Sequence, residues 1–174
     1  MRKLGGVLAG VALAAGSLAV VGVAGGPAGG QTPCPAQTLA ITGYPTPTLS
    51  APFGVAVDAA GNIYTADTVT DTVYRFNASG TQTLAIPATD ATPTLSAPVG
   101  VAVDAAGNIY TADAVTDTVY RFDASGTQTL AIPATNATPT LSDPYGVAVD
   151  AAGNIYTADP DTDTVYRFCT GVPT

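Results

Sequence analysis

Aspartates are the residues of this sequence with the clearest potential for chemistry. All thirteen acidic residues are Asp, and the chain contains no Glu and no His. The run Asp159-Pro160-Asp161-Thr162-Asp163 alternates carboxylates as a calcium-binding loop does, because hard cations take oxygen ligands. However, Thr164 stands where an EF-hand loop needs Gly, and no Glu follows. We therefore expect no cofactor, and we keep calcium at this loop as the alternative.

Other catalytic groups are scarce. Residues 29–174 contain no His, Glu or Lys, and the only two cysteines are Cys34 and Cys169. Because general bases and nucleophiles come mainly from these residue types, the sequence favours binding over catalysis.

The charge limits the partners. The whole chain has a net charge of −8, and residues 29–174 keep three Arg against thirteen Asp. Nucleic acids and anionic lipids are neutralised by Lys and Arg, so we expect neither as a partner. The partner predicted from the sequence is a protein or a glycan.

The N-terminus resembles an export signal. Met1, Arg2 and Lys3 precede an uncharged run over residues 4–24 and a small-residue stretch over 25–30. These are the three parts of a secretory signal peptide, predicted here over residues 1–28, so we expect a secreted protein. The run is long enough to span a bilayer, which leaves a membrane anchor as the alternative.

The elements that position the aspartates belong to a repeat. The stretch from Pro52 to Asp67 recurs at residues 98–113 and again at 144–159, so the period is 46 residues. A period of this size indicates one supersecondary unit used several times. The approximate repeats are 51–96, 97–142 and 143–169.

One repeat reads as four antiparallel strands. Short β-branched runs, bounded by Gly and Asp turn residues, predict strands over 54–57, 62–66, 72–76 and 81–86. The Thr- and Pro-rich connection over 88–97 is too long for a hairpin and should carry the chain into the next sheet. Four such strands and one long crossover describe a blade, so the fold class is an all-β β-propeller with three blades.

The repeat resembles a known family. The pattern from Leu49 through Pro52, Gly54 and Asp58 to Asp67, followed by Val73 and Phe76, is similar to the NHL repeat. The resemblance implies propeller blades, typically six to a ring. The sequence departs from the family in the second loop, where Thr70 and Thr72 replace the usual Asn and Arg. The basic surface of RNA-binding members is absent.

The two ends of the array are complementary in sequence. Residues 37–41 match the fourth strand, whereas the last repeat, completed at residues 143–169, has only the first three. Cys34, in the N-terminal segment 29–36, aligns with Ser79 and Ser125; Cys169 aligns with Asn77 and Asp123 and precedes the tail 170–174. We therefore expect a Cys34–Cys169 disulfide where one terminal strand completes the other terminal sheet.

Three blades are few, because closed propellers usually have four to eight. A homodimer with two bridges between chains would complete a six-bladed ring. The alternatives are a closed three-bladed monomer with an internal bridge, and an open array.

In a propeller, the long connections between blades and the loops between second and third strands share one face. The copies differ mainly on this face, which is our candidate binding surface. The candidate residues are Phe53, Val99, Tyr145, Asp67, Asp113, Asp159 and Asp161. The first function predicted is a non-catalytic scaffold that binds through this surface. The second is a metal-dependent enzyme, resembling propeller lactonases and lyases, that uses Asp residues of the central channel.

Overall fold

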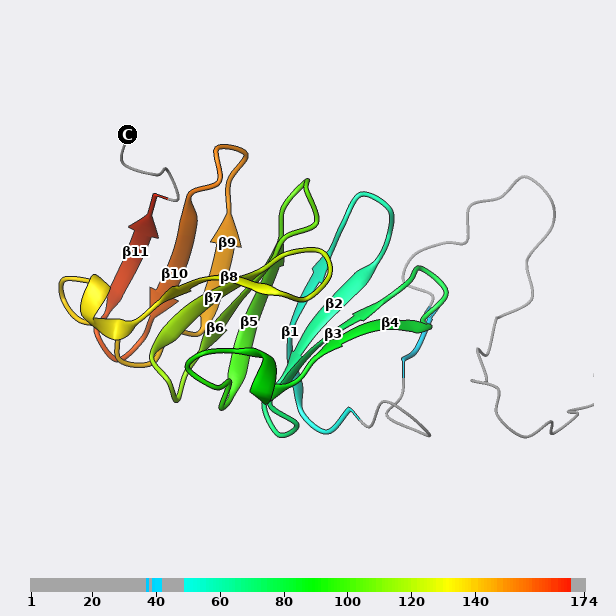
Figure 1. Ribbon diagram of the computed structural model, residues 1–174, viewed down its shortest axis with the longest axis horizontal. Coiled ribbons are helices and arrows are strands. Elements are labelled where there is room, and N and C mark those ends of the chain that lie inside the picture. Colours follow the sequence, from blue (N-terminus) through cyan, green and yellow to red (C-terminus); the bar gives the residue numbers. More distant parts are fainter. Residues whose placement is uncertain (1–36, 38, 42–48, 170–174) are drawn as a thin grey trace, which may run out of the picture.

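A computed structural model describes residues 37, 39–41 and 49–169. The predicted signal peptide, the segment 29–36 with Cys34 and the tail 170–174 lie outside the described residues. Three antiparallel sheets stand side by side along the molecule (Figure 1). None of the helices in the described part is long and apolar enough to cross a membrane.

Each sheet corresponds to one repeat. The strands of the first blade are β1 (Pro52–Val57), β2 (Ile63–Asp67), β3 (Thr72–Phe76) and β4 (Gln82–Ile86). Those of the second are β5 (Pro98–Val103), β6 (Ile109–Asp113), β7 (Thr118–Phe122) and β8 (Gln128–Ile132). The third has β9 (Gly146–Val149), β10 (Ile155–Asp159) and β11 (Thr164–Phe168). The strands of each sheet lie in chain order, as in the blades of a β-propeller.

The crossovers contain structure that the sequence analysis did not predict. Short 3-10 helices, η1 (Ala88–Asp90) and η2 (Ala134–Asn136), follow β4 and β8. In the first, the Asp90 amide donates to the Pro87 carbonyl at 3.0 Å, and the Leu95 amide donates to the Ala88 carbonyl at 3.3 Å. These bonds fold the Thr- and Pro-rich connection back so that Leu95 is buried between blades.

The hydrophobic core lies between blades, because alternate residues of each strand point to opposite faces. The first blade contributes one face to the first junction: Tyr64, Ala66, Val73 and Ile86. The second blade contributes the opposite face: Val101, Ile109, Tyr120 and Phe122. The second junction repeats this arrangement with Tyr110, Ala112, Val119 and Ile132 against Ile155 and Tyr166.

Glycine on the first strand of each blade allows the next blade to approach closely. A Cβ atom added to Gly54 would lie 2.5 Å from the Val99 carbonyl oxygen. One added to Gly100 would overlap the Tyr145 carbonyl oxygen. Only a residue without a side chain fits at these two junctions.

Leu39 and Ile41 lie where the fourth strand of a preceding blade would lie. A Cβ atom on Gly126 would meet Leu84 and Ile86 of the preceding blade, each at 3.2 Å. A Cβ atom on Gly80 would meet Leu39 at 3.2 Å and Ile41 at 3.3 Å in the same way. Leu39 and Ile41 therefore lie against the first blade where the outer strand of a preceding blade would lie.

Candidate functional site

The candidate site is one face of the array, which we call the loop face. It includes the loop between the second and third strands of each blade, at 67–71, 113–117 and 159–163. It also includes the connection that enters the first strand of each blade, at 49–53, 95–99 and 141–145. Backbone hydrogen bonds join these two sets of loops. The Thr68 amide donates to the Ala51 carbonyl at 3.1 Å, and the Ala114 amide donates to the Ala97 carbonyl at 3.2 Å. The prediction that both sets of loops share one face is confirmed.

Asp67 holds the first of these loops together. Its Oδ2 atom accepts the amides of Ser50 at 2.6 Å and Ala51 at 3.1 Å. Its Oδ1 atom accepts the amides of Val69 at 3.1 Å and Thr70 at 3.0 Å. Burial would raise the pKa of Asp67, but these hydrogen bonds outweigh it and hold the pKa below its usual value.

Asp113 and Asp159 repeat this arrangement in the other two blades. Asp113 accepts the amides of Ser96 at 2.7 Å and Thr116 at 2.9 Å, and Asp159 accepts those of Ser142 at 2.7 Å and Thr162 at 3.1 Å. All three aspartates are buried. The structure therefore gives these predicted binding residues a positioning role, because their carboxylate oxygens already accept backbone amides.

A second set of aspartates lies on the loop face. Asp71, Asp117 and Asp163 each close a loop with a left-handed backbone, with φ of 50°, 49° and 51°. Burial and then repulsion from Asp113 and Asp67 raise the pKa of Asp71. Burial and then repulsion from Asp159, Asp113 and Asp161 raise that of Asp117. The loop face is therefore a region of negative potential.

The acidic set extends into the third blade. Burial and then repulsion from Asp161, Asp159 and Asp117 raise the pKa of Asp143. Asp161, a predicted site residue, is exposed and takes part in this repulsion. Asp71, Asp117 and Asp143 were not on the predicted list, although their place in acidic loops was a signal that could have found them.

The apolar candidates differ in accessibility. Phe53 is 66% exposed and Tyr145 is 44% exposed, whereas Val99 is buried between the first two blades. Val99 cannot contact a ligand without opening that junction. Val69 and Val115, at the tips of the β2–β3 and β6–β7 loops, are each 64% exposed and were missed by the sequence analysis.

The residues described do not fit a bound metal. No group of three or more Asp, Cys, Glu or His side chains in the described ranges could hold an ion. In the loop at 159–163, Asp159 is turned to the backbone amides and the Asp163 amide donates to the Pro160 carbonyl at 3.4 Å. The geometry gives no support to the calcium alternative.

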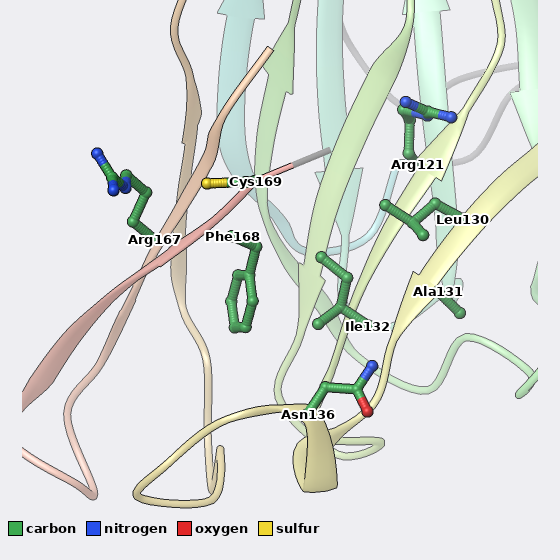
Figure 2. Close-up of a pocket in the computed structure, with 8 residues that line it drawn as sticks. All are labelled: Arg121, Leu130, Ala131, Ile132, Asn136, Arg167, Phe168 and Cys169. Atoms are coloured by element: carbon green, nitrogen blue, oxygen red, sulfur yellow. The ribbon is translucent and has the colours of Figure 1, made fainter. Parts of the chain in front are cut away.

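A groove lies apart from the loop face, between β8 and β11 (Figure 2). Its volume is about 560 Å³, and its lining includes Leu130, Ile132, Phe168 and Cys169. Cys169 is exposed and has no disulfide partner among the described residues. The expected partner Cys34 lies outside the described residues, so the predicted disulfide stays a prediction.

Residues 63–141 match the family model described as "SMP-30/Gluconolactonase/LRE-like region". This match covers less than half of the chain, and no curated protein matches.

Solved structures match over a larger part of the chain. A streptogramin B lyase has a TM-score of 0.57 at 17% identity, over 74% of this chain and 43% of that chain. A catalytically inactive virginiamycin B lyase from Staphylococcus aureus with quinupristin has a TM-score of 0.54 at 14% identity, over 74% and 44%. Kuenenia stuttgartiensis hydrazine synthase has a TM-score of 0.51 at 16% identity, over 71% and 37%.

This chain therefore spans less than half the length of each of these structures. At identities this low, the similarity is evidence for the fold alone. Together with the three sheets of the repeat, they show that the chain is an all-β array of β-propeller blades.

Proposed function

We propose that this protein is a secreted, non-catalytic β-propeller scaffold that binds a basic segment of a partner protein through the loop face. The observation that carries the proposal is the cluster of aspartates on the loop face, where burial first and then repulsion from neighbouring carboxylates raise the pKa values of Asp71, Asp117 and Asp143. A cationic partner relieves that repulsion, and complementary charge favours both encounter and specificity.

The apolar residues of the same face support binding over simple solvation. Val69 and Val115 stand 64% exposed beside the acidic positions, and Phe53 and Tyr145 are also accessible. Apolar and aromatic contacts within a charged rim are typical of protein interfaces. A neutral glycan would use the aromatic side chains but not the charge.

We further propose that the blades are NHL repeats and that residues 1–28 direct export. Both proposals rest on the sequence patterns described above. The spacing from Pro52 to Asp67 and its two later copies carries the first.

Binding of a decalysine peptide tests the scaffold proposal. Asp117→Asn removes one charge from the loop face, and Asn tolerates the left-handed backbone at this position. We expect it to weaken binding about threefold, as for an exposed charge pair, with the loss fading in high salt. The measurement is the dissociation constant by calorimetry, with decaglutamate as the peptide control.

Asp123→Asn is the matched control variant. It removes the same charge from the hairpin between β7 and β8, where Asn77 of the first blade already accepts equivalent amides at 3.1 and 2.9 Å. Equal losses for both variants would mean that decalysine responds to net charge and not to the loop face. Binding of a neutral oligosaccharide but not decalysine would favour the glycan.

An enzyme is the alternative, favoured by the match to a gluconolactonase-like region. Against it, residues 29–174 contain no His, Glu or Lys, the residue types from which general bases and nucleophiles mainly come. Metal analysis of the purified protein separates the two functions. A cation bound in a one-to-one ratio after dialysis would support the enzyme and contradict the scaffold.

A further inference from the structure

The two ends of the array expose opposite faces of a blade junction. On the first blade, Phe53, Val55 and Val57 are 66%, 70% and 59% exposed. Of their counterparts in the second blade, Val99 and Val101 are buried and Val103 is partly buried. We call the exposed set the first-blade face; a pocket at this face is also lined by Ile41 and Ile63.

The third blade exposes the other half of the same junction. Val165 is 73% exposed, whereas its counterparts Val73 and Val119 are 1% and 0% exposed. Ala158 is exposed where Ala66 and Ala112 are fully buried. We call the surface of Gly146, Ala158 and Val165 the third-blade face.

The backbone at Gly146 is also uncovered on this face. Among the described residues, a Cβ atom at this position would meet only the Ala158 Cβ atom, at 3.7 Å. The equivalent atoms on Gly54 and Gly100 would collide with the backbone of a following blade. By analogy with Gly54 and Gly100, the first strand of a further blade would lie over Gly146.

We infer that two copies of this chain close head to tail into a six-bladed ring, each placing its first-blade face on the third-blade face of the other. One copy has three blades and three copies would have nine, whereas closed propellers have four to eight. Two copies make both junctions at once with two-fold symmetry, leaving neither face exposed. This inference is independent of the proposed ligand.

The third sheet has three strands, with β11 at its edge, where a fourth strand from the other copy would pair. In the first blade, β4 pairs with β3 through Val73 with Ile86 and Arg75 with Leu84. Leu39 and Ile41 already lie where the outer strand of a preceding blade would lie, and in the ring that blade is the third blade of the other copy. The pairs expected across the copies are Val165 with Ile41 and Arg167 with Leu39.

The cysteines then meet across the copies. Asn77, the counterpart of Cys169, accepts the Ser79 hydroxyl at 2.7 Å, and Ser79 is the counterpart of Cys34. In the second blade the corresponding Ser125 hydroxyl lies 2.6 Å from the Asp123 carboxylate. Side chains at these two positions therefore contact each other in both complete blades. The two positions are two residues apart, so their Cα atoms are no more than about 7 Å apart. This distance is close enough for a disulfide.

Each bridge forms by thiol–disulfide exchange with an oxidised dithiol or glutathione disulfide. The Cys34 and Cys169 thiols lose two electrons and two protons to form the S–S bond, and the oxidant is reduced to two thiols. Two bridges join one ring.

The mass of the full chain after export, or after incubation with oxidised glutathione, tests the inference. We expect twice the mass of one chain by light scattering, and a dimer on a non-reducing gel that reduction converts to monomer. Cys169→Ser should remove the covalent dimer on the gel and keep the doubled mass in solution. A monomer, or an open series of larger assemblies, would overturn the inference.

Paired substitutions test the faces themselves. Val165→Lys should halve the mass, whereas Val69→Lys, at a 64% exposed valine on the loop face, should leave it doubled. Gly146→Ala should also halve the mass without loss of β-sheet circular dichroism, because the added methyl group meets none of the described residues of its own chain closer than 3.7 Å. A doubled mass for both of these third-blade variants would contradict the proposed contact.

Discussion

Asp113 is the buried carboxylate on which the central loop depends. It is 0% exposed and accepts the amides of Ser96, Val115 and Thr116 at 2.7, 3.2 and 2.9 Å. Asp113→Asn replaces one acceptor oxygen with an NH₂ group that faces a donor. We expect the free energy of unfolding to fall by about 3 kcal/mol, since hydrogen bonds to charged groups are strong and a buried donor is left unpaired.

Urea unfolding at neutral pH measures this loss, with Asp90→Asn as the control. Asp90 is exposed, and Asn136 already occupies the equivalent place in the next copy. The control should change the free energy of unfolding by less than about 0.5 kcal/mol. Similar small changes for both variants would mean that Asp113 does not hold the loop.

The sequence predicted the position of each aspartate better than its role. Recurrence placed Asp67, Asp113 and Asp159 directly after a strand, and the loop face was confirmed. Whether a carboxylate points toward backbone amides or toward solvent depends on the fold of the neighbouring connection, which follows no local pattern. The burial of Val99 was not predicted for the same reason, because it is the preceding blade that covers this side chain.

At the scale of the element, the first hairpin of each blade is built around one aspartate. Asp104 accepts the amides of Ala106 and Asn108, both at 2.9 Å, and the Tyr110 hydroxyl at 2.9 Å. Burial would raise the pKa of Asp104, but the hydrogen bonds led by that from the Asn108 side chain hold it below its usual value. Asp58 and Asp150 also have lowered pKa values, led by hydrogen bonds from Asn62 and Asn154.

These hairpins should make the protein sensitive to acid. A pKa lowered on folding stabilises the folded state above the unfolded value of about 4, and the stabilisation is lost as pH falls through the folded value. We expect the thermal midpoint to fall below pH 4, and to fall less steeply in Asp104→Asn. Asn suits the turn, because Asn77 accepts amides in the same way in a neighbouring hairpin. Parallel curves for the two proteins would contradict this role of Asp104.

The strands were largely predictable from the sequence. Period-two alternation and the turn glycines gave the third strand its observed bounds and placed the others within two residues, because Gly61 and Gly80 require positive φ, observed at 80° and 83°. The 3-10 helices were not predicted, since a three-residue helix leaves no periodicity to read.

At the scale of the whole molecule, stability should depend on how many neighbours each blade has. In repeat arrays the stability is roughly the sum of each unit and its junctions. The second blade has a neighbour on both faces, whereas the first and third each leave one face exposed in a single chain. In the closed six-bladed ring, every blade would have two neighbours.

Hydrogen exchange distinguishes these states without reference to mass. In wild-type protein, the amides of β2, β6 and β10 should exchange at similar rates, because each blade is covered on both faces. In Gly146→Ala, β6 should exchange at least about tenfold more slowly than β10, which corresponds to about 1.4 kcal/mol of additional protection against local opening. A gradient of the same size in both proteins would mean that the ring is open, because only a closed ring removes the difference between the middle of the array and its ends.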